Sequence, residues 1–378
     1  MLTLKTDCRH FPGDRPCTPH KQTGIKCDSC TQYEPVDVRI VIIKLEAVGD
    51  VLRTTCILPG LREKYPKGEI FWVTQPEAVP LFHENPLVDR VLPYGSMECQ
   101  SVLAVEHFDL LINVDAAPKS AALASYSNAK SKIGFGVTQR GDIMCFNPEA
   151  ETWLHMGAFD DVKKQNTLSY QQLMLNICGL KPSSKEIQLS LNEDELMQGD
   201  QFRRQHGIGE GVPVVGLNTG ASGRWEMKKW TFDGYRAVIQ KLLEETPAHI
   251  VLYGGVIEYE RNTALAKGFP DRLTIADTRH SLRSLFAILN ISDVVVTGDT
   301  LALHAATALG KRVVAIFGPT SSAEIEPYDR VTKITSATMA CKCYYKPVCD
   351  QDVNCMNTIP PQQVFDVVTR ELAGIRRI

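Results

Sequence analysis

Short apolar segments recur along the chain, and each is followed by a stretch long enough for a helix. The first, VRIVIIKL at residues 38–45, is a continuous β-branched run between Pro35 and Gly49. Such runs are typical of strands that are buried on both faces of a parallel sheet. Further candidate strands lie at residues 69–74, 89–94 and 109–115. This alternation predicts a doubly wound α/β layer.

A polar segment at residues 181–195 interrupts the alternation, and a second series begins after it. Its candidate strands lie at residues 213–220, 249–255, 273–277, 293–299 and 312–318. Two Rossmann-like domains are therefore predicted, which also suits a chain of 378 residues. We expect a Cys-rich segment at 1–35, an N-terminal domain at 36–185, a C-terminal domain at 186–360 with a Cys-rich insert at 341–355, and a terminal helix at 361–378 that packs back on the N-terminal domain.

Composition and missing motifs exclude several classes of protein. With 41 basic and 44 acidic residues the net charge is -3, so no nucleic-acid partner is expected. No apolar run approaches the ~20 residues of a membrane span, and the N-terminus lacks the apolar centre of a secretion signal, so we expect a cytoplasmic protein. No phosphate loop, dinucleotide-binding loop or nucleophile elbow follows a strand.

Ligands of doubly wound sheets bind outside the carboxyl ends of the strands, so the residues after each strand are the site candidates. Three segments stand out: VGDVLRTT (48–55), NTGASGRWEMKKW (218–230) and TGDTLALHAATALGKRVVAIFGPT (297–320). In the second, Lys228 and Lys229 are placed to hold a diphosphate as point charges, although a solvated lysine pair is the plain alternative.

The first and third segments each place an acidic residue at the start of a helix. Asp299 and Thr300 precede an Ala-rich helix whose N-terminal amides form an anion site, and His304 lies one turn beyond Thr300 on the same face. Ordinary helix capping explains Asp299, Thr300 and also Asp50 equally well, and His304 fits a packed core group.

These landmarks together resemble glycosyltransferase family 9, the heptosyltransferases that move a heptose from ADP-heptose onto an acceptor such as the inner core of lipopolysaccharide. The resemblance covers about residues 38 to 375. It implies the GT-B architecture, in which two Rossmann-like domains face a cleft. The segments that carry it, in the order of the family, are KLEAVGDVLRTTCILPGLREKYP, DLLINVDAAPKSAALA, KKW, GGVIE, SLRSLFAIL, GDTLALHAATAL and FGPT.

The resemblance also implies residue roles in an inverting transfer from an ADP-sugar that needs no catalytic metal. Asp50 matches the catalytic base, Lys228 the lysine that contacts the diphosphate and the developing charge, and Glu258 the acid that contacts ribose. Where the family usually has Asp-Thr-Gly, this chain has Asp-Thr-Leu. The other implied donor-binding residues are Thr219, Gly220, Asp299, Thr300, Leu301, Ala302 and His304, and Asp115 and Lys119 match on the acceptor side.

The cysteines form two clusters and four single positions. Cys8, Cys17, Cys27 and Cys30 end in a Cys-x2-Cys pair, which can grip one ion, so a structural metal is predicted, zinc by default. Free thiols and an iron-sulfur cluster are the alternatives. Cys341, Cys343, Cys349 and Cys355 resemble a Cys-rich insert of the family, which holds either a second metal (zinc or iron) or plain thiols. Single cysteines at 56, 99, 145 and 178 are expected to be small buried hydrophobes.

The sequence is compatible with several functions. The implied partners are a nucleotide-sugar donor and a glycan, lipid-linked or protein acceptor, with peripheral contact at the inner membrane face. Transfer to a protein or small-molecule hydroxyl, a noncatalytic GT-B protein that binds a partner through its Cys-rich head, and a sugar-nucleotide epimerase of similar fold are the alternatives. Retention of Asp50, Lys228, Asp299 and His304 together favours the transferase. The acceptor and the oligomeric state are not indicated.

Overall fold

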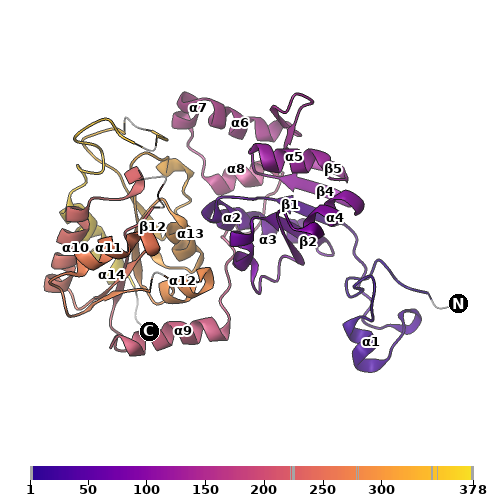
Figure 1. Ribbon diagram of the computed structural model, residues 1–378, viewed down its shortest axis with the longest axis horizontal. Helices are drawn as coiled ribbons and strands as arrows, with labels where there is room; N and C mark the ends of the chain where they lie inside the picture. The colour runs from indigo at the N-terminus through magenta and orange to yellow at the C-terminus, as the bar shows by residue number, and fades with distance from the viewer. Residues whose placement is uncertain are drawn as a thin grey trace.

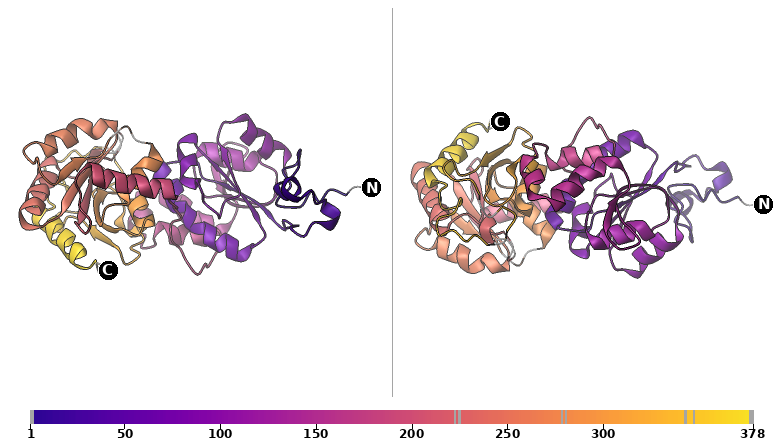
Figure 2. Two further views of the ribbon diagram at one scale, coloured as in Figure 1. Left: turned by 90° about the horizontal axis from the view of Figure 1, so that it is seen from below. Right: turned by 90° about the horizontal axis from the view of Figure 1, so that it is seen from above.

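Two α/β domains lie side by side, and a small N-terminal segment projects from the first domain on the side away from the second (Figures 1 and 2). The arrangement is seen in a computed structural model that describes residues 3–221, 223, 226–277, 279, 281–341, 344–346 and 348–375. Residues 3–35, which we name the Cys module, make up the projecting segment.

The first domain is built on a six-stranded sheet of order β3-β2-β1-β4-β5-β6. Its strands are parallel except β6, which pairs antiparallel with β5. Strand β1 lies between β2 and β4, and all its residues after Arg39 are buried, as its β-branched sequence predicts. The strands are β1 (Arg39–Ile43), β2 (Glu69–Thr74), β3 (Arg90–Pro93), β4 (Phe108–Asn113), β5 (Ala129–Val137) and β6 (Ile143–Cys145).

The second domain repeats this topology in a parallel sheet of order β12-β11-β10-β7-β8-β9. Counted from its own first strand, each sheet has the order 3-2-1-4-5-6, so the strand order reverses between β1 and β4 and between β7 and β10. Ligand crevices form at these switch points. The strands are β7 (Val214–Asn218), β8 (His249–Tyr253), β9 (Leu273–Ile275), β10 (Val294–Gly298), β11 (Arg312–Ile316) and β12 (Val331–Ile334).

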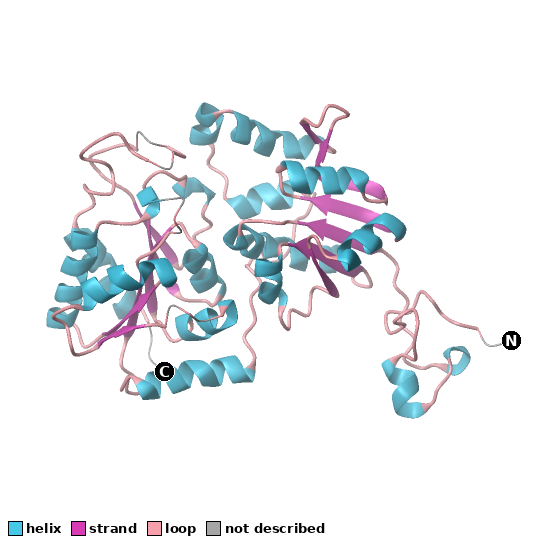
Figure 3. Ribbon diagram, in the orientation of Figure 1, coloured by secondary structure: helices cyan, strands magenta, loops and turns pink. Residues whose placement is uncertain are grey.

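Helices cover both sheets (Figure 3). In the Cys module and the first domain they are α1 (Thr18–Thr23), α2 (Val48–Thr54), α3 (Leu58–Lys64), α4 (Met97–Val105), α5 (Pro118–Tyr126), α6 (Glu151–Ala158), α7 (Asp160–Gln165) and α8 (Tyr170–Ile177). The later helices are α9 (Glu193–Gln205), α10 (Phe232–Glu245), α11 (Tyr259–Ala266), α12 (Leu282–Leu289), α13 (Leu301–Ala308) and α14 (Pro361–Ala373). None of the described helices is both long and apolar enough to span a bilayer.

Each strand predicted from an apolar run is present, within one or two residues at its ends. Strands β5, β6 and β12 were not predicted from the sequence. The terminal helix was predicted wrongly: α14 packs on α10 and on the C-terminal sheet, not on the N-terminal domain. Its apolar face, Val364, Phe365 and Val368, joins the core of its own domain, so packing there removes the most apolar surface from water.

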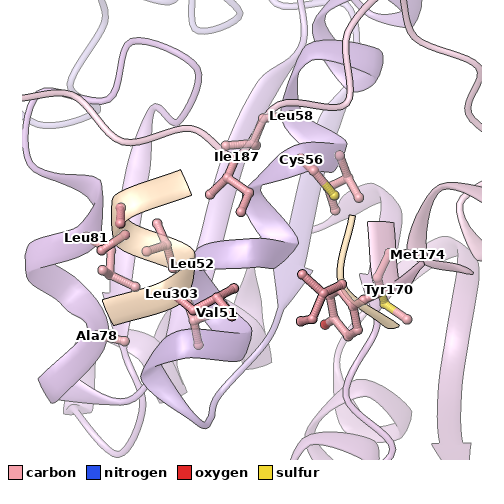
Figure 4. Packing of buried hydrophobic residues seen from close by; sticks show 14 of the residues in the cluster. Val51, Leu52, Cys56, Leu58, Ala78, Leu81, Tyr170, Met174, Ile187 and Leu303 are labelled. Atoms are coloured by element: carbon pink, nitrogen blue, oxygen red, sulfur yellow. The ribbon is translucent and has the colours of Figure 1, made fainter. Parts of the chain in front are cut away.

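The domains share a hydrophobic contact between α2 and α13. Leu303 of α13 belongs to the same buried cluster as Val51 and Leu52 of α2, and Figure 4 shows these side chains together. A Cβ atom at Gly49 would lie 3.2 Å from the His304 ring and 3.4 Å from the Leu301 Cα, closer than most real contacts. Glycine at the start of α2 therefore permits the close approach of the two helices.

Candidate active site

A cavity of about 820 Å³ lies between the domains, at the carboxyl ends of β1, β7, β8 and β10. Its size is in the range of sites that enclose a ligand as large as a nucleotide sugar. The first domain contributes Asp50, Arg53, Trp153 and Lys163 to its lining. The second contributes Asn218, Gly220, Lys228, Glu258, Asp299, Thr300, Leu301, Ala302, His304, Glu324 and Tyr345, among others.

Asp50 lies in the first turn of α2 and does not cap the helix. The N-cap position is Ala47, and no side chain caps this end. The Asp50 side chain is 37% exposed, and its Oδ1 accepts a hydrogen bond of 2.9 Å from Nε of Arg53. The capping interpretation of Asp50 is therefore wrong, and its carboxylate faces the cavity.

Positive charges keep the Asp50 carboxyl ionised. Desolvation raises the pKa of Asp50, but the charges of Arg53 and then Lys44 lower it by more, to about 2. Arg53 is itself held in place, because its guanidinium lies 3.8 Å from the centre of the Tyr170 ring. The hydroxyl of Tyr170 is 2.6 Å from Oγ1 of Thr54. Asp50 is thus a carboxylate at every pH at which the fold is expected to persist.

Lys228 and Asp299 form an ion pair on the opposite wall of the cavity. Nζ of Lys228 donates to Oδ2 of Asp299 at 3.0 Å and to its backbone oxygen at 3.1 Å. Burial raises the pKa of Asp299, but Lys228 and the other positive groups nearby together lower it by more, so the net pKa shift is downward. A Cβ at Gly298 would lie 2.4 Å from the carbonyl oxygen of Lys228, so only glycine lets the two segments meet.

The N-terminus of α13 opens into the cavity without a side-chain cap. Thr300 is the N-cap residue, but its side chain accepts no hydrogen bond from the helix. Instead Oγ1 of Thr300 accepts a 3.2 Å hydrogen bond from Asn218 Nδ2 and lies 3.0 Å from Oγ1 of Thr297. The ordinary capping explanation therefore fails for Thr300, and the first-turn amides remain suited to an anion. Leu301 begins the helix without a positive φ.

His304 is a neutral, buried group beside this wall. Its Nε2 atom lies 4.0 Å from Oδ1 of Asp299, and the residue is 5% exposed. Burial lowers the pKa of His304 to about 4, and the charge of Arg53 acts in the same direction. At neutral pH the imidazole can therefore donate one hydrogen bond and accept another, but it does not add a positive charge.

Glu258 brings an acceptor oxygen to the cavity. Its Oε2 atom accepts a 2.9 Å hydrogen bond from the amide of Gly255. The buried Oε1 atom has no hydrogen-bond partner among the described residues, and Nζ of Lys229 lies 3.8 Å away. A buried acceptor of this kind is suited to a ligand hydroxyl, as found on ribose. Gly220 lies directly against this carboxylate, where a Cβ would clash with it.

Four predicted residues do not line the cavity: Lys229, whose Nζ donates to Oε1 of Glu226 at 2.8 Å, Thr219, Asp115 and Lys119. Thr219 is fully buried and donates a 2.5 Å hydrogen bond to Oδ1 of Asn262, because successive residues of an extended segment point to opposite sides. Asp115 is buried beside β1, where it accepts from the amide of Leu45 at 3.1 Å and pairs with Lys44 at 3.3 Å. Lys119 is exposed on α5.

Arg53, Lys163 and Tyr345 line the cavity but were not predicted. Nζ of Lys163 lies 3.5 Å from the ring centre of Tyr345, which brings a helix of the first domain against a loop of the second. Burial lowers the pKa of Lys163. The hydroxyl of Tyr345 donates to Oε1 of Glu324 at 3.1 Å. The sequence gives a signal only for Arg53, which is three residues after Asp50 and hence on the same helical face.

The cysteine clusters differ in their surroundings. Cys8, Cys17, Cys27 and Cys30 are half-buried and line one small cavity of the Cys module. In the later cluster Cys355 is buried in the C-terminal core, Cys341 and Cys349 are half-buried, and Cys343 lies outside the described residues. Across the described part of the chain, no three His, Cys, Asp or Glu side chains are grouped so that they could hold a metal ion. Both predicted metal sites remain predictions.

Comparison with known proteins finds relatives along most of the chain. It is 22% identical over 313 residues to the lipopolysaccharide core heptosyltransferase OpsX of Haemophilus influenzae, covering 79% of this chain and 84% of the relative. A family 9 glycosyl transferase of Veillonella parvula superposes with a TM-score of 0.71 at 18% identity, covering 90% of this chain and 99% of that structure. The ADP-heptose lipopolysaccharide heptosyltransferase II of Escherichia coli superposes with a TM-score of 0.66 at 18% identity, covering 89% and 99%.

These superpositions confirm the predicted GT-B-like fold of two Rossmann-like domains. The family match is more specific than the fold, because it extends from residue 99 to residue 352 and so includes more than half of the sequence. The chain therefore belongs to glycosyltransferase family 9, the heptosyltransferase family, and is a glycosyltransferase.

Proposed function

We propose that the protein transfers a heptose from ADP-heptose to a hydroxyl of a lipopolysaccharide-core or related surface-glycan acceptor, with inversion at the anomeric carbon. One observation carries the proposal: a carboxylate of the first domain faces the same cavity as a lysine, an open helix N-terminus and an unsatisfied Glu258 oxygen of the second. The named activities of the relatives support the donor and the acceptor class. Such an acceptor places the reaction at the cytoplasmic face of the inner membrane.

The second domain is suited to hold the nucleotide diphosphate. Oε1 of Glu258 would accept from a ribose hydroxyl, while Nζ of Lys228 and the amides at the start of α13 would contact the diphosphate. As the bond between the anomeric carbon and the phosphate oxygen breaks, negative charge grows on that oxygen. These groups stabilise the departing ADP, so we propose that the step uses no divalent ion.

The first domain is suited to activate the acceptor. Asp50 would take the proton from the acceptor hydroxyl as its oxygen attacks the anomeric carbon from the face opposite to ADP. A carboxylate with a pKa of about 2 is a weak base in the free protein. The diphosphate brings negative charge into the cavity, which raises the pKa of Asp50 toward a more effective value. Arg53 would act as a positioning residue that fixes the carboxylate.

Donor binding is tested by thermal unfolding with ADP, ADP-heptose and the UDP and GDP analogues. We expect ADP compounds to raise Tm, because a ligand that binds only the folded state stabilises it. Lys228→Ala and Glu258→Gln should reduce this shift, each measured against the Tm of the same variant without ligand. Lys241→Ala, on α10 and outside the cavity, is the control. No shift with any ADP compound would overturn the proposed donor.

The base is tested by Asp50→Asn, which keeps the shape of the side chain but cannot take a proton. We expect kcat for heptose transfer to fall roughly 100 to 10,000-fold, as for loss of a general base, while the Kd for ADP stays close to that of the native protein. Asp142→Asn, an exposed carboxylate of the same domain, should leave both values unchanged. Native turnover in Asp50→Asn would show that another group takes the proton.

The positioning role of Arg53 is tested through the pH dependence of kcat/KM. Activity that needs the Asp50 carboxylate is present above its pKa and is lost as the pH falls through it. Because the pKa of Asp50 is about 2, protonation of this carboxylate should not lower kcat/KM of the native protein at any pH where the fold persists. Arg53→Gln removes the largest opposing charge, so the acid limb should move to higher pH, and Arg53→Lys should restore most of the difference. Identical profiles for Arg53→Gln and the native protein would contradict this role.

A further inference from the structure

We propose that Cys8, Cys17, Cys27 and Cys30 bind one structural metal ion of the zinc class, and that this ion orders the Cys module. The proposed transfer reaction does not use this part of the chain, which lies away from the second domain (Figure 1). The inference therefore stands apart from the proposed function.

The Cys module has almost no core of its own. Between residues 3 and 35, Pro19 is the single buried residue. Yet the segment contains a helix ending in a left-handed Gly24, a 3-10 turn at Cys27–Ser29 and defined backbone hydrogen bonds. Segments of this size with so little buried apolar surface need a cross-link to keep one structure. Among the described residues the four cysteines form no disulfide, so their sulfur atoms are available as metal ligands.

The four cysteines line one small cavity, although they are spread over 23 residues; among the described residues no three of them are grouped closely enough to form a ligand set, so an ion would have to draw them together. The cavity is about 20 Å³ and is also lined by Phe11, Pro19 and Tyr33. This is roughly the space of one water-sized sphere, which suits a single ion. Cys27 begins the 3-10 turn and Cys30 follows it, and the Cys30 amide donates to the Cys27 carbonyl at 3.4 Å. Two thiolates spaced in this way can bind one ion.

The surroundings favour a ligand set of four thiolates over one that includes histidine. His20 does not line the cavity, and its Nδ1 lies 2.8 Å from the carbonyl oxygen of Ile25. His10 also lines the cavity, where its Nε2 lies 3.6 Å from a carboxylate oxygen of Glu34, but the four cysteines alone complete a tetrahedral set. Lys5 lines the cavity, where its positive charge would offset the negative charge of four thiolates around a divalent ion. Metal binding would draw the thiols together and release their protons.

One ligand also joins the module to the first domain. Cys8 forms an isolated antiparallel bridge with Pro35, and the neighbouring Arg9 amide donates to the Glu34 carbonyl at 2.8 Å. The guanidinium of Arg9 donates to the backbone oxygen of Gly68 at 2.9 Å and forms an ion pair with Asp89. An ion bound at Cys8 would therefore fix the module to the end of the sheet through Arg9.

The test is metal analysis of the full chain purified anaerobically without chelator. We expect Cys27→Ser/Cys30→Ser to contain about one equivalent of metal less than the native protein. Cys145→Ser, a half-buried cysteine outside both clusters, should keep the native content. Cys349→Ser is the control for the later cysteine cluster, because this substitution should not remove the ion of the Cys module. Equal metal content in the native protein and Cys27→Ser/Cys30→Ser would overturn the proposal.

A second measurement uses the native protein alone, so it does not depend on the folding of a variant. Iodoacetamide labelling with peptide mapping should show Cys27 and Cys30 protected, and a chelator should remove this protection. Protection that is removed by a reductant but not by a chelator would indicate a disulfide and overturn the proposal, as would labelling that is the same with and without chelator. The ADP-induced Tm shift should persist in Cys27→Ser/Cys30→Ser, so this inference and the proposed function can fail separately.

Discussion

The contact between α2 and α13 is the feature on which the candidate site depends. The two sheets have the same topology, and each presents a switch point at the carboxyl ends of its strands. Neither switch point holds a complete set of groups alone. Leu303 packs against Val51 and Leu52. Because Gly49 has no side chain, the two helix N-termini can also approach each other closely. Asp50 of one domain thereby faces the Lys228–Asp299 pair of the other across a single cavity.

The charges in this cavity are arranged in pairs before any ligand binds. Asp50 is paired with Arg53 and Asp299 with Lys228, so both carboxylates are kept ionised despite their surroundings. His304 between them is neutral. A diphosphate that enters would compete with Asp299 for Lys228. Its negative charge would also offset the positive charges that lower the pKa of Asp50. The pairs thus place the cations in advance, which avoids reorganisation when charge develops during transfer.

The sequence predicts the strands and the residues that follow them better than it predicts contacts between distant segments. Strands β1, β7, β8 and β10 are β-branched runs buried on both faces, and the residues just after them, including Asp50, Gly220 and Asp299, reach the cavity as predicted. Residues that depend on contacts between distant segments were harder to predict. Lys163 and Tyr345 are 182 positions apart in the sequence and come into contact only because the two domains pack against each other.

Local patterns also misled where tertiary packing decides the outcome. Asp50 and Thr300 have the sequence of helix caps, yet neither side chain caps its helix. Leu301 begins α13 without a positive φ, and glycine at position 49 of the facing helix permits α2 to approach it closely. Asp115 supports the end of β1 through Lys44 and the Leu45 amide, away from the cavity. No periodicity of the sequence distinguishes such a buried support from an acceptor-binding group.

The most direct test of this account is heptose transfer by Gly49→Val. A valine there would push α2 away from Leu301 and His304, which separates Asp50 from the donor site without touching Lys228 or Glu258. The account predicts a large fall in kcat and a much smaller effect on the Kd for ADP, because Lys228 and Glu258 are left in place while the start of α13 is only displaced. Gly157→Val, at a helical glycine where a Cβ would meet no atom within 4 Å, should keep native values for both. Native kcat in Gly49→Val would contradict the claim that the contact between α2 and α13 sets the geometry of the site.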